Sequence, residues 1–331
     1  MSTVEADLPT PGGGAGAEAP VRRHHFSFGD PLFRWFTIIC AATVALAMFL
    51  LIGVLVKNSW FAIHVLKLKP LTTVAYNPGS NQYGALSSLF GTFVTTLIAM
   101  VIAVPLALAI ALLLVELVHP LVSRVLGTAV EMLAAVPSII FGMWGIFVVG
   151  PLMGNHIEPW IQSTPLGRLP LFSGSPIGVD VLTAGVVLSL MILPFITAVS
   201  RDVLKMVPTV VKEAGYGMGS TTYEVMRLVS MRYALSGIAG AVFLGLGRAL
   251  GETMAVAMVI GGNTITIPHS LFQNGTSVSA TLALRFGEAS SKLETSSLIE
   301  LALILFAITM VFQVIAQLWL ARARRMTGSR A

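Results

Sequence analysis

The sequence contains few charged residues and a single cysteine. Asp, Glu, Lys and Arg account for 11% of its 331 residues, whereas a soluble globular protein has about 25%. Hydrophobic residues account for 55%, and the mean hydropathy is +0.86. Because a chain with so little polar surface cannot remain dissolved in water, we expect lipid to surround it. The one cysteine, Cys40, lies in an apolar run and excludes an intramolecular disulfide.

The sequence also lacks the motifs of ATP hydrolysis and of intramembrane catalysis. It contains no G-x-x-x-x-G-K-[ST] phosphate loop, so any ATP hydrolysis must come from a separate polypeptide. It contains no H-E-x-x-H metal motif and no plausible pair of nucleophile and base. The sequence therefore predicts a transport subunit, with no catalytic residue, no metal site and no cofactor bound by this chain.

Six apolar runs are long enough to cross a bilayer as helices, which takes roughly 20 residues. The first run starts too late and is too long for a signal peptide, and no clear cleavage site follows it. Pro105, Pro137 and Pro194 lie within other runs, where each is expected either to kink its helix or to shape it around a pathway. The sequence therefore predicts an all-α integral membrane protein. Its six predicted transmembrane helices are Trp35–Val56, Leu86–Val115, Leu126–Gly150, Val181–Ser200, Tyr233–Gly262 and Leu298–Ala321.

The distribution of basic residues favours a cytoplasmic N-terminus. With that orientation, thirteen Lys and Arg residues fall on the cytoplasmic side and six on the external side, which satisfies the positive-inside rule. The net charge of +5 and the pI near 9.6 then reflect membrane topology and give no indication of nucleic-acid binding. Six spans also place the C-terminus in the cytoplasm, so we expect a multi-pass protein of the plasma (inner) membrane.

Three loops are predicted on the external side, and all are too short to form a separate enzymatic domain. They cover Lys57–Tyr83, Pro151–Gly178 and Asn263–Ser297. The middle loop is rich in proline, which favours an ordered, extended cover over a helix. Its prolines are Pro151, Pro159, Pro165, Pro170 and Pro176.

The loop between the fourth and fifth spans, "MVPTVVKEAGYGMGSTTYEVMRLVSMRY", predicts two short helices. Pro208 suits the first turn of a helix, and Gly217 and Gly219 can end it. Thr221 and Glu224 have the spacing of a capping box, so a second short helix is expected to start there. A helix, a glycine turn and another helix would form a rigid protrusion at the cytoplasmic membrane surface, which a partner could grip.

The same loop resembles the EAA loop of ABC-importer permeases. Glu213, Ala214 and Gly215 match the E-A-A triplet, with Gly215 in place of the second alanine, and Gly219 matches the glycine that follows. The end of the motif departs further from the family, because its isoleucine, leucine and proline are replaced. The replacing residues are Val229, Met231 and Arg232. The resemblance implies that Glu213, Ala214, Gly215 and Gly219 couple this chain to an ATPase.

Four further stretches resemble the permeases of phosphate-specific ABC importers: "YGALSSLFGTFVTT", "EMLAAVPSIIFGMWG", "LSLMILPFIT" and "GLGRALGETMAV". The likeness extends over about Tyr83 to Leu320. It implies a type I ABC importer fold (MetI-like), a second permease subunit, two ATPase subunits that use ATP and Mg, and an extracytoplasmic phosphate-binding protein. The paired permease of the same transporter and sulfate or molybdate permeases share this plan. A channel or secondary carrier is the alternative outside the class.

With this resemblance, the sequence predicts four regions. Residues 1–30, rich in Gly, Pro and Ala, are expected to form a disordered cytoplasmic tail. Residues 31–83 contain the first transmembrane helix and an external loop, residues 84–321 form the permease core, and residues 322–331 form a basic cytoplasmic tail.

Arg248 and Glu252 are the only formal charges between Tyr233 and Gly262. Residues four apart share one helix face, so the two side chains are expected to neutralise each other. An unpaired charge at the bilayer centre costs about 3 kcal/mol. The pair is therefore either a structural ion pair or part of the substrate pathway, with Arg248 attracting phosphate and Glu252 holding the arginine in the empty state. Two other carboxylates, Glu131 and Glu300, lie at predicted helix starts, where the helix dipole favours them.

Overall fold

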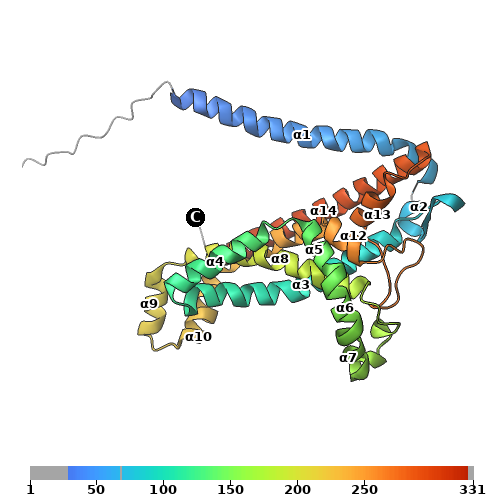
Figure 1. Cartoon of the computed structure of the whole chain (residues 1–331). Helices are drawn as coiled ribbons and strands as arrows, with labels where there is room; N and C mark the ends of the chain where they lie inside the picture. Colours follow the sequence, from blue (N-terminus) through green and yellow to red (C-terminus); the bar gives the residue numbers. More distant parts are fainter. Residues whose placement is uncertain (1–28, 68, 327–331) are drawn as a thin grey trace, which may run out of the picture. The chain divides into compact units, whose positions relative to one another are not determined.

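The computed structural model describes residues 29–67 and 69–326, and these residues are mostly helical (Figure 1). Most of the predicted N-terminal tail, residues 1–28, and residues 327–331 of the predicted C-terminal tail lie outside this range. The chain divides into two compact units, Met1–Leu51 and Ile52–Ala331, of which the second contains all elements discussed below except the first part of α1.

Most elements are α-helices, joined in places by short π-helical or 3₁₀ turns. The α-helices are α1 (Gly29–Leu66), α2 (Lys69–Thr72), α3 (Leu86–Leu112), α4 (Pro120–Ala134), α5 (Ser138–Trp144), α6 (Gly150–Leu152), α7 (Glu158–Ser163), α8 (Val181–Lys205), α9 (Thr209–Gly217), α10 (Thr222–Glu224), α11 (Met231–Leu250), α12 (Met254–Val259), α13 (Val278–Arg285) and α14 (Lys292–Met326). The π-helical turns are Leu113–Leu117, Gly145–Val149, Met153–Ile157 and Val225–Ser230. Strands β1 (Tyr76–Asn77) and β2 (Gln82–Tyr83) form an antiparallel hairpin in which Tyr76 pairs with Tyr83.

The described residues contain six helical segments long and apolar enough to cross a membrane, as the sequence predicts. They are Pro31–Leu66, Leu86–Leu117, Ser138–Ser163, Val181–Lys205, Thr222–Leu250 and Lys292–Arg322. The first, second, fourth and sixth segments each contain the whole of the corresponding predicted span. The third and fifth segments differ in position from their predicted spans.

The predicted third span, Leu126–Gly150, is wrong in its position. The apolar run is divided between two helices, because α4 ends at Ala134 and α5 begins after Pro137. Proline has no backbone N–H and disfavours helical geometry in the residue before it, so the helix cannot pass through Val136 and Pro137. The membrane-crossing segment starts at Ser138 instead and extends to Ser163.

The predicted extended cover over Pro151–Gly178 is also wrong in its first half, which is helical up to Ser163. Pro151 lies two residues after the π-helical turn Gly145–Val149, and Pro159 lies two residues after the turn Met153–Ile157. These turns widen the helix beside the two residues that cannot donate a backbone hydrogen bond. The rest of the segment has two 3₁₀ turns and extended connections.

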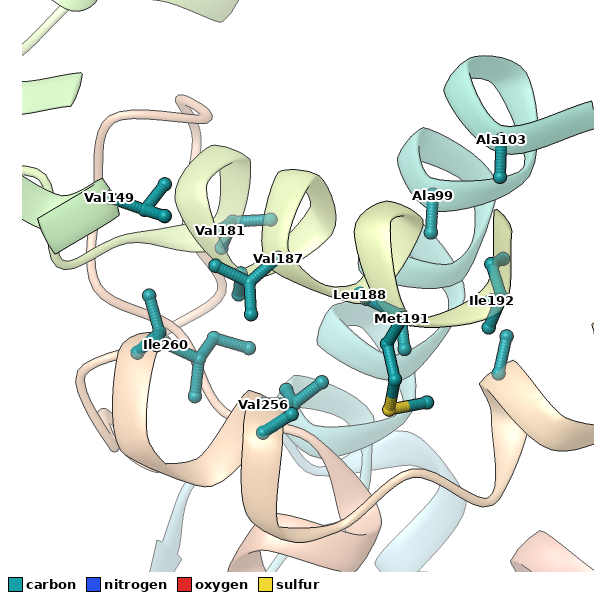
Figure 2. Close-up of a cluster of buried hydrophobic side chains, with 14 of the residues drawn as sticks. Ala99, Ala103, Val149, Val181, Val187, Leu188, Met191, Ile192, Val256 and Ile260 are labelled. Carbon is teal, nitrogen blue, oxygen red and sulfur yellow. The ribbon is translucent and has the colours of Figure 1, made fainter. Parts of the chain in front are cut away.

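The core of the second unit lies where α3, α8 and α12 meet. Alanines repeat every four residues along α3 and are fully buried against α8, which lets the two helix backbones approach closely. Figure 2 shows Ala99 and Ala103 beside the larger side chains of α8, with Val256 and Ile260 closing the cluster. The alanines are Ala99, Ala103, Ala107 and Ala111.

Glu131 and Glu300 do not lie at helix starts. Glu131 lies near the C-terminal end of α4, where the helix dipole disfavours a carboxylate, and Arg201 Nη1 donates to its Oε1 at 2.9 Å. Glu300 lies well inside α14, which begins at Lys292, and is buried. The prediction fails for Glu131 because the third span is divided, and for Glu300 because the sixth helix starts earlier than its apolar run.

Candidate functional site

The turn after α9 is built on Gly219. The N–H of Gly219 donates to the carbonyl of Tyr216 at 2.9 Å, and the N–H of Ser220 donates to the carbonyl of Gly215 at 3.3 Å. These two bonds and the left-handed conformation of Gly219, with φ +84°, form a Schellman cap. Pro208 is the N-cap of α9 and does not lie within its first turn. The predicted end of this helix at the glycines is confirmed.

The predicted capping box is present at the start of α10. Thr221 Oγ1 accepts from the N–H of Glu224 at 3.4 Å, and Glu224 Oε2 accepts from the N–H of Thr221 at 2.8 Å. The second helix is not a separate short one, however. It continues through the π-helical turn Val225–Ser230 into α11, so the helix that leaves the glycine turn is the fifth membrane-crossing segment itself.

Helix α9 is fastened to the rest of the chain at two points. Gly215 is buried, and a Cβ there would lie 3.2 Å from Val225 and 3.4 Å from Val229, so α9 packs closely on the start of the fifth segment. Lys212 Nζ lies 2.7 Å from Oε1 of Glu116, in the π-helical turn that ends the second segment. We call α9, its turn and α10 the coupling hairpin.

The coupling hairpin exposes Glu213, Ala214 and Gly219, and it buries Gly215. Several large apolar side chains are also exposed on or beside it, which is typical of a surface that a partner protein covers. They are Met206, Val210, Tyr216, Met218 and Tyr223. One side of the hairpin thus packs on the start of the fifth segment, and the other side is exposed and could contact a partner protein.

Arg248 lies in the last turn of α11 and is exposed. Its Cζ is 5.8 Å from the centroid of the Phe195 ring on α8, within the range of a cation–π contact. Among the residues that the structure describes, Arg248 forms no salt bridge. The guanidinium therefore keeps its hydrogen-bond donors available for an anionic ligand.

The expected neutralisation of Arg248 by Glu252 is wrong, because the helix does not continue between them. It ends at Leu250, and Glu252 lies in the break before α12. Glu252 Oε1 accepts from the N–H of Ala255 at 3.3 Å, while its backbone carbonyl accepts from the hydroxyl of Ser279. The predicted helix Tyr233–Gly262 is thus divided, and Ser279 of α13 donates a hydrogen bond to a carbonyl within the break.

Sequence reasoning missed a buried pair of carboxyl groups, Glu158 in α7 and Asp180 before α8. Both residues are fully buried. Asp180 Oδ1 accepts from the N–H of Thr183 at 2.8 Å and caps α8, and Glu158 Oε2 accepts from the N–H of Gly178 at 3.3 Å. Burial raises the pKa of the Asp180 carboxyl. An Asp directly before an apolar run is an N-cap signal, whereas nothing in the sequence marks Glu158.

No group of three His, Cys, Asp or Glu side chains in the described ranges could hold a metal ion. What the geometry does offer is an exposed arginine at a helix break and a hairpin continuous with the same helix. The model of the binding-protein-dependent transport system inner membrane component family matches residues 103–325. The chain belongs to this family.

Relatives within the family are similar to this chain over nearly its whole length. The phosphate transport system permease protein PstC of Pasteurella multocida is 44% identical over 316 residues, covering 94% of this chain and 97% of the relative. PstC of Mesorhizobium japonicum is 44% identical over 336 residues, covering 99% and 100%. PstC 1 of Mycobacterium tuberculosis is 34% identical over 317 residues, covering 89% and 94%. Since these relatives are named as permeases, the prediction of a transport subunit and not an enzyme is confirmed.

Solved structures of ABC transporters share the fold. A chain of a bacterial alginate ABC transporter, in complex with a periplasmic protein, aligns with a TM-score of 0.58 at 11% identity, covering 91% of this chain and 98% of that one. A chain of the MetNI methionine ABC transporter, in an inward-facing conformation, aligns with a TM-score of 0.50 at 17% identity, covering 72% and 94%. At these identities the likeness concerns the fold alone, and it confirms the predicted fold of an ABC-importer permease.

Proposed function

We propose that this chain is the permease subunit that carries inorganic phosphate across the inner membrane in an ATP-driven importer. The observation that carries the proposal is the similarity, at 44% identity over nearly the full length, to permeases of phosphate transport systems. Arg248 supports it, because an exposed guanidinium at a helix break, with no salt bridge to any described residue, offers bidentate hydrogen bonds to an oxyanion. Arg248 and Glu252 are the residues proposed for the substrate pathway.

The coupling hairpin is the proposed contact with the ATPase subunits, which would use ATP and Mg. Two features support this assignment: α10 continues into the fifth segment, which carries Arg248, and α9 packs on the start of that segment at Gly215. A second permease subunit would complete the pathway. An extracytoplasmic phosphate-binding protein would dock on the external loops, at the end of the membrane helices opposite to the coupling hairpin. The excess of basic residues near the hairpin end and at the C-terminus supports cytoplasmic termini.

Uptake in cells tests the proposed substrate. In cells that lack this chain, its return is expected to restore uptake of labelled phosphate and to leave uptake of labelled sulfate unchanged. A matched control is the return of the chain without its ATPase partner, which should restore neither. Restored sulfate uptake without phosphate uptake would identify a different anion, and phosphate uptake without the ATPase would indicate a channel or secondary carrier.

Gly219→Trp is expected to uncouple ATP hydrolysis from uptake. The φ of +84° at Gly219 strains any side chain there, although nothing lies within 4 Å of a Cβ, so the variant distorts the exposed turn and leaves the core intact. The measurement is phosphate taken up per ATP hydrolysed in reconstituted vesicles. Gly217→Ala is the control, since Gly217 is helical and equally open, and it should transport normally. Normal ATPase binding and normal transport by Gly219→Trp would refute the coupling role.

A further inference from the structure

A cavity of about 740 Å³ lies between the second half of α1 and the start of α14. It is distinct from the coupling hairpin and from Arg248. Its residues from α1 lie between Lys57 and His64, and its residues from α14 lie between Lys292 and Ile299. Both segments belong to the second compact unit, Ile52–Ala331.

The two walls of the cavity are held together by Ser296. The Ser296 hydroxyl donates to the carbonyl of Asn58 at 2.7 Å and accepts from the N–H of Ala62 at 3.1 Å. These two backbone groups are four residues apart in α1, so the hydroxyl bridges partners that an α-helix would normally join directly. Ser59 and Ala62 are fully buried at this contact. These hydrogen bonds fix α1 and α14 relative to each other at the cavity, so the shape of the cavity is set by specific contacts between the two helices.

The charged residues that line the cavity are basic. Lys57 and Lys292 contribute ammonium groups and His64 contributes an imidazole, and none of the described residues in the lining carries a carboxylate. Within the described part of the chain, neither lysine forms a salt bridge. Lys292 Nζ lies 5.2 Å from the centroid of the Phe61 ring. The nearby carboxylate of Glu294 is buried elsewhere and accepts from the N–H of Ser290 at 3.1 Å.

The cavity is bordered by aromatic and apolar side chains that are exposed. Trp60 is 57% exposed, and its ring centroid lies 4.7 Å from that of His64 with the two rings tilted by 45°; Phe61 is 43% exposed. Along the chain, the apolar run of the first transmembrane helix ends at Val56, directly before Lys57. Aromatic residues next to lysines at the end of an apolar run are typical of the level where lipid headgroups meet the hydrocarbon. A ligand in this cavity would therefore have an anionic part and an apolar part.

We propose that this cavity binds the headgroup of an anionic phospholipid. Lys57 and Lys292 contact the phosphate, and the acyl chains lie along exposed apolar side chains of the part of α1 within the second unit, such as Val54. Inorganic phosphate has the same anionic chemistry, but it would leave the aromatic border and most of 740 Å³ unused. The proposal does not rest on the transported substrate, since it concerns a different part of the fold.

Lipid retention in nanodiscs tests the proposal. The assembled transporter is placed in phosphatidylcholine discs with or without phosphatidylglycerol, and co-purifying lipid is counted by native mass spectrometry. Lys57→Gln with Lys292→Gln is expected to weaken phosphatidylglycerol retention by roughly thirtyfold. Lys67→Gln with Lys69→Gln removes two exposed lysines outside the cavity and is expected to leave retention unchanged. Equal retention by both double variants would overturn the proposal.

Two further measurements separate the alternatives. Retention of phosphatidylglycerol by the unaltered protein should fall as NaCl is raised, because the contact is electrostatic, and retention that does not respond to salt would contradict the proposal. Labelled inorganic phosphate is also titrated onto the transporter in pure phosphatidylcholine discs. Phosphate binding that is lost in Lys57→Gln with Lys292→Gln, together with unchanged lipid retention, would assign the cavity to free phosphate and overturn the lipid assignment.

Discussion

Arg248→Gln is expected to reduce phosphate uptake by roughly a hundredfold, because the loss of charge-assisted hydrogen bonds to the anion costs about 3 kcal/mol. Glutamine preserves much of the side-chain length but has neither the charge nor the planar fork of donors. Arg248→Lys should retain part of the uptake, since it retains the charge. The measurement is the initial rate of labelled phosphate uptake, with the amount of assembled transporter determined by co-purification of the ATPase.

Arg232→Gln is the matched control for this experiment. Arg232 is exposed on the same helix, α11, nearer to the coupling hairpin and away from the break. It should assemble and transport as the unaltered protein does. If Arg248→Gln also transports at the normal rate, Arg248 has only a structural role, through its contact with Phe195.

Glu116→Gln is expected to lower stability by about 3 kcal/mol, because it leaves Lys212 as a largely desolvated, unpaired charge. The side chains of Lys212 and Glu116 are only 17% and 7% exposed, and their 2.7 Å contact joins α9 to the end of the second segment. Loosening this contact should also reduce phosphate uptake per ATP hydrolysed, since α9 would move without the membrane helices. The measurements are the thermal unfolding midpoint and the coupling ratio in vesicles.

Two variants control for the loss of a carboxylate. Glu288→Gln breaks the pair with Arg285, but the side chains of Glu288 and Arg285 are 69% and 41% exposed, so about 1 kcal/mol or less is expected. Glu116→Leu combined with Lys212→Met replaces both charges by apolar groups and should restore most of the stability. Equal midpoints for Glu116→Gln and Glu288→Gln would show that the Lys212–Glu116 pair does not anchor the hairpin.

Local chemistry made much of the fold predictable. Long apolar runs predict membrane helices without reference to the rest of the chain, because every backbone polar group in lipid must be satisfied within its own helix. The glycine end of α9 and the capping box at Thr221 were predictable for the same reason, since each is formed by residues within a few positions of one another.

The errors occur where one apolar run contains two structures. Leu126–Gly150 and Tyr233–Gly262 are each apolar enough on average to be read as one span, so hydropathy alone does not show where a helix stops. Pro137 is a local signal for the first break. Gly251 is the only local signal for the second break. The hydroxyl of Ser279, in α13, donates a hydrogen bond to the carbonyl of Glu252 within this break.

By itself, the sequence determined the membrane class, the helical fold, the approximate number of spans and the position of the coupling hairpin, because these depend on neighbouring residues. Only the tertiary structure decided the partners of the charges. Glu116 and Lys212 form an ion pair although they are 96 positions apart in the sequence. Arg248 contacts Phe195 of another helix, whereas the nearby Glu252 accepts a hydrogen bond from the backbone N–H of Ala255. Such contacts depend on how helices pack, and the spacing of residues along one chain does not specify which helix faces will meet.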